Sequence, residues 1–207
     1  MIVNSTNVKM VWCNLQVSSK KNRSLIRVLD IFISSGILLV TMPLLILIFF
    51  ILLYESRRPF FVQRRLGINE SEFRIIKFRT MITSTADKPT HLVSGFAVTV
   101  VGRLLRRTKL DELPQLVNVL KGEMSLVGPR PCLPNQHDVI TERRVRRVFE
   151  VLPGVTGLAQ IKGVDMSNPV SLASLDSELI QNLDLNHYLK YLLLTATGKG
   201  FGDKILH

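Results

Sequence analysis

The 207-residue sequence is poor in cysteine. Cys13 and Cys132 are the two cysteines it contains, too few for a disulfide framework and without the spacing of a metal-ligand motif. A small disulfide-stabilised domain and a zinc-ligand motif are therefore excluded, and a reducing cytoplasm is expected. Internal repeats and low-complexity tracts are also lacking, which leaves one or at most two small domains.

Nucleic-acid signals are scarce as well. The segment 138–150 predicts a strongly basic helix with a partial apolar side. No aromatic stacking platform or recognised nucleic-acid motif accompanies it. We therefore expect a solvated or membrane-facing helix, and no nucleic-acid partner.

What the sequence does have is positive charge combined with apolar residues. The net charge is +11 and the mean hydropathy is +0.25. A soluble basic protein is rarely that apolar, and a protein with many membrane spans is rarely that charged. A basic body with one membrane segment fits both values, and its cations would be attracted to anionic headgroups by about 1 kcal/mol each.

Residues 31–54 form that membrane segment. The run is uncharged and exceeds the roughly 20 apolar residues that a membrane helix needs; it lies too deep in the chain, and lacks the cleavage site, for a signal peptide. Pro43 in its middle removes a hydrogen bond and kinks the helix. Basic residues flank both ends: Lys20, Lys21, Arg23 and Arg27 before, and Arg57, Arg58, Arg64 and Arg65 after.

These flanks favour a re-entrant helix. Because the positive-inside rule places both flanks on the cytoplasmic side, a helix that enters one leaflet, breaks at Pro43 and returns satisfies both. A kinked helix that crosses the bilayer is the alternative. We expect an N-terminal extension at 1–19, a membrane-inserted segment at 20–58 and a cytoplasmic body at 59–207.

The body begins with a small β element. Two extended pieces, 60–63 and 73–81, surround a turn at Gly67. If the second is a strand, Lys77 and Arg79 share a face and project together toward an anion; a solvated edge is the alternative. Residues 82–102 lack a firm period and predict a loop over or beside a site.

Two adjacent acids, Asp111 and Glu112, mark the most informative stretch. Pro114 is tolerated only in a first helical turn, so a helix is expected to start near Asp111. That start places both acids at the positive end of the helix dipole, which favours their ionised forms. The helix carries an apolar stripe: Leu113, Leu116, Val117 and Leu120.

Cations lie close to this pair along the chain. Arg106 precedes the acids closely enough to fold back on the same ligand, and Pro131 pushes Arg130 toward an extended backbone on a stiff loop. Paired acids, helix and rigid arginine together indicate chemistry on a phosphate ester. The glycine-rich segment 153–163 permits close backbone approach and is expected to form a pocket wall, with Gln160 as its polar handle.

The tail predicts two helices, near 171–183 and at 187–197. The second is too short to span a bilayer and is interpreted as interfacial. The expected fold is α+β and mostly helical: a re-entrant membrane helix-hairpin and a compact cytoplasmic catalytic domain with amphipathic interfacial helices and a small β element.

Four segments resemble bacterial sugar transferases of the monotopic phosphoglycosyl transferase family, in its small catalytic-core form. They are 77–81 (KFRTM), 102–106 (GRLLR), 110–131 (LDELPQLVNVLKGEMSLVGPRP) and 153–160 (PGVTGLAQ). The resemblance implies transfer of a sugar 1-phosphate from a UDP-sugar to polyprenyl phosphate, normally undecaprenyl phosphate, with release of UMP. It further implies Mg²⁺, a helix broken at Pro43, the cytoplasmic face of the bacterial inner membrane, the first membrane step of surface-glycan assembly and a possible homodimer.

The same resemblance assigns roles to residues. Asp111 matches the nucleophile that forms a covalent phosphosugar intermediate and is the expected metal ligand, and Glu112 matches its partner. Arg106 and Arg130 match phosphate-holding residues, assisted by Lys77.

The sequence departs from the family where the sugar pocket is expected. Val164 stands where many members have arginine, for which Lys162 is a compensating candidate. The sugar is therefore not determined. Two other functions stay open: a membrane-tethered basic binding protein without catalysis, and a Mg²⁺-dependent hydrolase of nucleotide sugars.

Overall fold

The structure, a computed structural model, describes residues 5–81 and 98–198. Most of the loop expected at 82–102 lies outside these ranges, and its last three residues begin a helix instead. The described chain is mostly helical with small β elements, as expected. In chain order the elements are α1 (Ser5–Ser56), β1 (Phe60–Leu66), η1 (Ile68–Glu70), β2 (Glu72–Phe78), α2 (Val100–Thr108), η4 (Leu110–Gln115), α3 (Leu116–Lys121), β3 (Ser125–Val127), α4 (His137–Val145), η5 (Val148–Glu150), β4 (Gly154–Thr156), α5 (Leu158–Ile161), α6 (Pro169–Asn182) and α7 (Leu185–Ala196).

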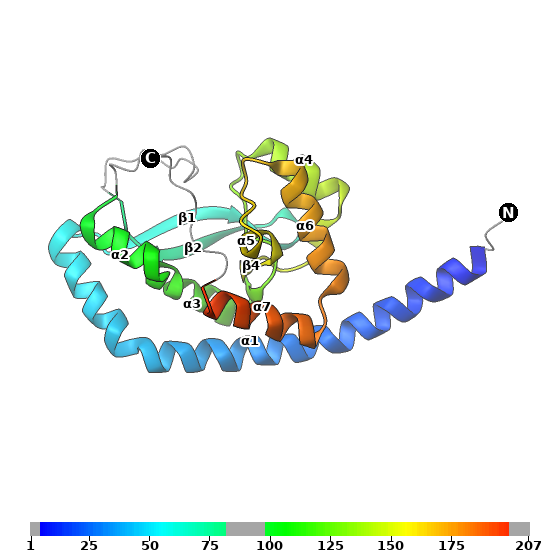
Figure 1. Ribbon diagram of the computed structural model, residues 1–207, viewed down its shortest axis with the longest axis horizontal. Helices are drawn as coiled ribbons and strands as arrows, with labels where there is room; N and C mark the ends of the chain where they lie inside the picture. The colour runs from blue at the N-terminus through cyan, green and yellow to red at the C-terminus, as the bar shows by residue number, and fades with distance from the viewer. Residues whose placement is uncertain (1–4, 82–97, 199–207) are drawn as a thin grey trace.

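Helix α1 runs along one side of the molecule and bends around its end (Figure 1). It comprises 52 residues and contains Pro43, which cannot donate a helical hydrogen bond and so accounts for a bend. Residues 23–56 are long and apolar enough to cross a membrane by length and composition.

Both arms of α1 pack against the rest of the protein. In the first arm, Ile26 is buried in the main hydrophobic core together with Val119 of α3. In the second arm, Leu52 joins a separate cluster with Phe78 of β2 and Leu105 of α2. The long apolar helix therefore forms part of the body's core on its inner side.

Polar contacts fix the first arm more specifically. The buried carboxylate of Asp30 accepts hydrogen bonds from the Tyr188 hydroxyl at 2.8 Å and the Leu126 backbone N–H at 2.9 Å. One turn earlier, the Arg27 guanidinium donates to the Leu120 carbonyl oxygen in the last turn of α3. Because hydrogen bonds are directional, these contacts set the rotation of α1 about its axis.

The β elements are two small sheets. Strands β1 and β2 pair in antiparallel register, with Gln63 opposite Ile75, which confirms the two extended pieces predicted around Gly67. Strands β3 and β4 pair in parallel and were not predicted, because three residues are too short to show an alternating pattern.

The expected helix at the two acids differs in geometry. Residues Leu110–Gln115 form a 3₁₀ segment, and the α-helix begins at Leu116. The predicted apolar stripe is also shifted: Val119 is fully buried, whereas Val117 is 37% exposed. A 3₁₀ turn has 3.0 residues per turn instead of 3.6, so the side chains that follow it are rotated relative to the predicted face.

The basic helix expected at 138–150 is broken. Helix α4 ends at Val145, and Arg147 has a left-handed backbone with a φ of 57°. The prediction that this helix is solvated or membrane-facing is wrong for Arg143, which is 1% exposed. Its guanidinium is buried because it pairs with Asp176 of α6 at 2.7 Å.

Helices α6 and α7 confirm the two helices predicted in the tail. In α7, Tyr188 and Tyr191 are buried in the main core, whereas Leu193 is 65% exposed. Helix α7 lies beside α1 along the same side of the molecule (Figure 1). An amphipathic α7 thus packs one face on the core and leaves an apolar side chain outside.

The parallel β3–β4 pair depends on a close approach of the backbones of Gly154 and Gly128. A side chain at Gly154 should therefore destabilise the protein. A Cβ atom at Gly154 would lie 2.1 Å from the Gly128 backbone nitrogen, so Gly154→Ala must push apart two backbones. We expect a loss of about 1–3 kcal/mol of unfolding free energy, measured as a lower melting temperature.

The matched control is Gly36→Ala in α1, where an added Cβ meets no atom within 4 Å. Alanine is favoured over glycine inside a helix by roughly 0.5–1 kcal/mol, so this variant should melt no lower than the parent. Equal melting temperatures for Gly154→Ala and the parent would contradict the steric argument.

Candidate active site

The site is built around the two adjacent acids in η4. Asp111 is 8% exposed, and Glu112 is also largely withdrawn from water. Two carboxylates at neighbouring positions in a partly buried setting repel each other unless cations compensate. The cations come from β2, from the loop after β3 and from α2.

Glu112 is held between two cations. Its Oε1 atom accepts a hydrogen bond from Lys77 Nζ at 2.6 Å and from Arg130 Nη2 at 2.7 Å. Burial opposes the ionised form, but these ion pairs prevail and hold the pKa of the Glu112 carboxyl well below its ordinary value. Glu112 is therefore a fixed anion that positions Lys77 and Arg130.

Asp111 behaves in the opposite way. Burial and the neighbouring Glu112 charge raise the pKa of the Asp111 carboxyl to about 6, although Lys77, Arg106 and Arg130 all act to lower it. The expectation that the helix start favours the ionised form is thus wrong for Asp111. The physical reason is that desolvation dominates, and the short 3₁₀ segment does not offset it.

Arg106 reaches the pair from α2. Its Nε atom donates to the Thr80 hydroxyl at 2.8 Å, and its charge acts on Asp111. The helix ends at Thr108, and the next residue, Lys109, adopts a left-handed conformation with a φ of 56°. This turn reverses the chain so that Arg106 and Asp111 lie in the same site, as their spacing in the sequence predicted.

Arg79 does not project beside Lys77, as the strand pattern predicted it would. Strand β2 ends at Phe78, so the alternation that placed Arg79 beside Lys77 does not continue. The Arg79 guanidinium donates to the carbonyl oxygens of Arg58 and Phe60 and lies over the ring of Phe61. These contacts hold it against β1 and the end of α1.

Gln160 and Lys162, the two expected pocket residues, have separate surroundings. Gln160 donates from Nε2 to the Val155 carbonyl oxygen at 3.1 Å, which stabilises the β4–α5 turn. Lys162 pairs with Glu178 of α6 at 3.3 Å on the surface. The structure does not bring either side chain into the ion-pair cluster of Glu112.

Asn118 is a site-building residue that the sequence reasoning missed. Its fully buried amide donates to the Arg74 carbonyl oxygen at 2.7 Å and accepts from the Ile76 N–H at 3.3 Å. The side chain thus pairs with the free edge of β2 as a neighbouring strand would. It fixes the register of the strand that presents Lys77. The predicted apolar stripe left Asn118 on the opposite face of the helix, so the sequence pattern gave no signal for it.

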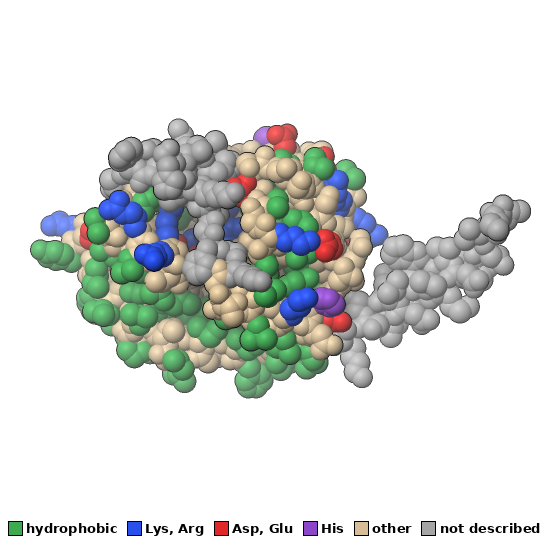
Figure 2. Space-filling view, viewed as in Figure 1, with side chains coloured by type: hydrophobic (Ala, Val, Ile, Leu, Met, Phe, Trp, Pro, Cys, Tyr) green, Lys and Arg blue, Asp and Glu red, His purple; other side chains and the backbone are tan. Residues whose placement is uncertain are grey.

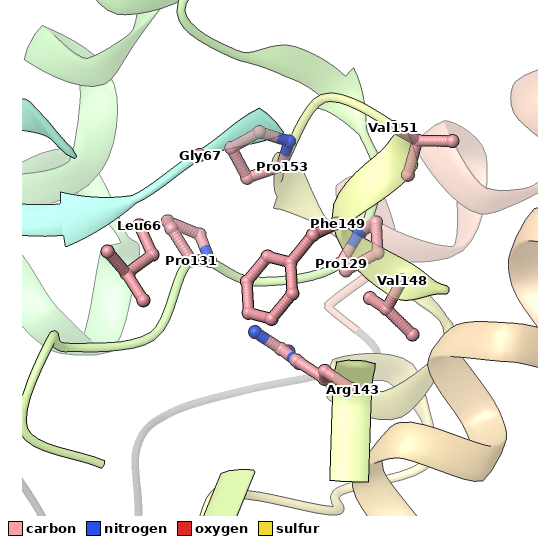
Figure 3. A pocket seen from close by; sticks show the side chains of 9 residues that line it. All are labelled: Leu66, Gly67, Pro129, Pro131, Arg143, Val148, Phe149, Val151 and Pro153. Atoms are coloured by element: carbon pink, nitrogen blue, oxygen red, sulfur yellow. The ribbon is translucent and has the colours of Figure 1, made fainter. Parts of the chain in front are cut away.

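The loop carrying Arg130 is held from behind. Arg143 donates from Nη1 to the Arg130 carbonyl oxygen at 2.8 Å, and Arg65 donates to the Pro131 carbonyl oxygen at 3.0 Å. A small cavity lies behind this loop (Figure 3). It is lined by Leu66, Gly67, Pro129, Pro131, Arg143, Val148, Phe149, Val151 and Pro153.

A ready-made metal site is absent within residues 5–81 and 98–198, since no three His, Cys, Asp or Glu side chains come together there. Mg²⁺ in proteins is commonly bound by one or two carboxylates together with substrate phosphates. Asp111 fits this mode, because it is a carboxylate beside three phosphate-compatible cations. Glu112 fits it less well, since Lys77 and Arg130 share one of its oxygens.

Known sugar transferases resemble this chain in sequence. The chain is similar to the uncharacterized sugar transferase EpsL of Bacillus subtilis (43% identical over 66% of this chain and 67% of the relative). It is also similar to the UDP-glucose:undecaprenyl-phosphate glucose-1-phosphate transferase of Caulobacter vibrioides (38% identical; 82% of this chain, 67% of the relative). A third relative is the undecaprenyl-phosphate galactose phosphotransferase of Salmonella typhimurium (30% identical; 93% of this chain, 44% of the relative).

The relatives cover between 66% and 93% of this chain. Residues 21–199 match the family described as bacterial sugar transferase, and this range contains the acids, their three cations and most of α1. With most of its length covered by that match, the chain belongs to the bacterial sugar transferase family.

Proposed function

We propose that the chain transfers a sugar 1-phosphate from a UDP-sugar to undecaprenyl or another polyprenyl phosphate and releases UMP. The observation that carries the proposal is the pair of unlike acids: Glu112 is fixed as an anion, whereas Asp111 has a pKa raised to about 6. The names of two relatives, a UDP-glucose:undecaprenyl-phosphate glucose-1-phosphate transferase and an undecaprenyl-phosphate galactose phosphotransferase, support the reaction class.

Asp111 is the proposed nucleophile. An ionised Asp111 oxygen bonds to the phosphorus that carries the sugar, the bond from that phosphorus to the bridging oxygen breaks, and UMP leaves with the electron pair. An oxygen of polyprenyl phosphate then attacks the same phosphorus and displaces the Asp111 carboxylate. Desolvation makes a carboxylate a stronger nucleophile than it is in water.

The cations supply charge compensation for this attack. An anion that approaches a diphosphate is repelled, so positive charge must offset the developing negative charge. Arg106, Arg130 and Lys77 all act on Asp111 and so lie where that charge develops. Bound Mg²⁺, held by Asp111 and the substrate phosphates, would supply further neutralisation.

The membrane placement of α1 completes the proposal. We infer a re-entrant helix at residues 20–58 that bends at Pro43 without the predicted break, and a cytoplasmic body at 59–207, on the inner membrane's cytoplasmic face. Two observations support it: both ends of the run are basic, and both arms of the bent helix pack on one body.

Exposed apolar side chains lie on the side of the protein that would face the lipid if α1 is re-entrant. Hydrophobic side chains gather along the side formed by α1 and α7 (Figure 2). The most exposed ones on α1, α2 and α7 are Phe32, Leu39, Val40, Phe50, Tyr54, Val100, Leu104 and Leu193. Contact of these side chains with lipid would hold the acids close to the headgroups, where polyprenyl phosphate presents its phosphate.

Replacement of the nucleophile tests the chemistry. With Mg²⁺ and polyprenyl phosphate, membranes that contain the protein should release UMP from one member of a UDP-sugar panel. Asp111→Asn should lower this rate by about a thousand-fold or more. Asp111→Asn should melt no lower than the parent at neutral pH, because it removes a buried charge. Full activity in this variant would contradict the mechanism, and sugar phosphate set free without polyprenyl phosphate would indicate a hydrolase.

The raised pKa of Asp111 predicts the pH dependence. The nucleophile must be ionised, and a pKa of about 6 in place of the ordinary value leaves a growing fraction protonated as the pH falls below 6. We expect the rate of UMP release at low substrate concentration to fall about tenfold per pH unit below about 6 and to level off above it. A rate that stays constant down to pH 4.5 would show that Asp111 is not the titrating nucleophile.

Labelling from one side of the membrane tests the re-entrant helix. Single cysteines are placed at Ser24 and Arg58, which flank the apolar run, in a protein whose Cys13 and Cys132 are replaced by serine. In sealed inverted vesicles, a membrane-impermeant maleimide should label both positions, because both flanks face the cytoplasm. Labelling of one position alone in inverted vesicles, and of the other in right-side-out vesicles, would establish a helix that crosses the bilayer.

A further inference from the structure

Arg143 is a buried cation outside the cluster of acids. It lies on α4, 33 residues before its partner Asp176 on α6, and it is 1% exposed. Its side chain points toward the loop that carries Pro129 and Pro131 (Figure 3). A charge in this position is costly unless every part of it is paired.

The contacts of Arg143 connect two parts of the protein. Its Nε and Nη2 atoms donate to Asp176 Oδ2 at 3.0 Å and 2.7 Å, and its Nη1 atom donates to the Arg130 carbonyl oxygen at 2.8 Å. The Arg130 side chain in turn reaches Glu112 at 2.7 Å. A continuous chain of contacts therefore runs from α6 to the acids.

Stability alone does not account for this pair. A buried ion pair can often be replaced by apolar side chains of similar volume without loss of stability. Such side chains cannot donate to the Arg130 carbonyl oxygen. The loop there has no regular secondary structure, and a cavity lies behind Pro129 and Pro131. The backbone of this loop is therefore fixed in part by hydrogen bonds from neighbouring segments, and the bond from Arg143 is the one that reaches the Arg130 carbonyl oxygen.

We propose that Arg143 is a positioning residue: oriented by Asp176, it holds the Arg130 backbone where the Arg130 guanidinium reaches Glu112. The inference rests on the proposed function for its catalytic consequence, since Arg130 compensates charge in the transfer. The structural part of the inference, that the buried Arg143 guanidinium holds this loop, does not depend on which sugar or acceptor the protein uses.

The test replaces the pair by apolar residues. Arg143→Met combined with Asp176→Leu removes both charges and the donor to Arg130 while keeping a buried, space-filling pair. We expect a melting temperature close to that of the parent and a kcat for UMP release lowered by about 100-fold, as for a misplaced catalytic group. Asp176→Asn keeps an oxygen acceptor for Arg143 and should retain far more of the activity.

The adjacent residue supplies the control. Arg144 makes a bidentate pair with Glu70 at 2.7 Å and 2.6 Å, but this pair is on the surface. Arg144→Gln should leave kcat unchanged, because exposed pairs contribute little. If the double variant does not fold, Arg143→Lys replaces it: this change keeps the charge but loses the planar fork that serves both partners at once, and the same fall in kcat is expected.

A second readout needs no substrate. The carboxyl of Asp111 is followed by ¹³C NMR as a function of pH, with the signal identified by its loss in Asp111→Asn. Displacement of Arg130 removes a nearby positive charge, so the midpoint should rise by about half a pH unit or more in the Arg143 variants and stay unchanged in Arg144→Gln.

The two readouts separate the possible failures. A folded double variant with the parent's kcat and the parent's midpoint would overturn the positioning role. A parent protein that releases no UMP from any UDP-sugar, together with a midpoint that rises in the Arg143 variants alone, would overturn the proposed function and leave the positioning role in place.

Discussion

The ion pairs of Glu112 with Lys77 and Arg130 join three separate parts of the chain. Lys77 belongs to the β1–β2 hairpin, Glu112 to the 3₁₀ segment η4, and Arg130 to the loop after β3. All three side chains are largely withdrawn from water, and a partner removed from such a site leaves an uncompensated charge, at a cost of several kcal/mol. The surrounding structure is arranged to keep both cations in place: Asn118 fixes the strand of Lys77, and Arg143 contacts the loop of Arg130.

The same ion pairs make the two acids unequal. Once Glu112 has taken the direct contacts with Lys77 and Arg130, its charge and the burial of the site act together to raise the pKa of Asp111. An acid in this state is poised to react: it is ionised for most of the time at neutral pH, yet it is poorly solvated. The sequence order of Asp111 and Glu112 did not reveal this difference, since both residues occupy the same predicted helix start.

The sequence predicted the parts of the site that are close together along the chain. Asp111, Glu112 and Arg106 lie within one short stretch, and the strand pattern and the family resemblance supplied Lys77 and Arg130. The apolar run with Pro43 was also evident, because a membrane segment has a strong compositional signal. The contacts of Arg143 with Asp176 and of Asn118 with β2 were missed, because a buried partner 33 or 44 residues away leaves no periodic pattern. Arg79 was misplaced because strand β2 ends at Phe78, three residues before the predicted end at Met81.

The most direct measurement of the central claim is the mass of the protein after incubation with its UDP-sugar and Mg²⁺ in the absence of polyprenyl phosphate. The account predicts a gain of one sugar phosphate on the peptide that contains Asp111, an equimolar release of UMP, and loss of the adduct when polyprenyl phosphate is added. UMP release that requires polyprenyl phosphate from the start, with no adduct on Asp111 at any time, would contradict it.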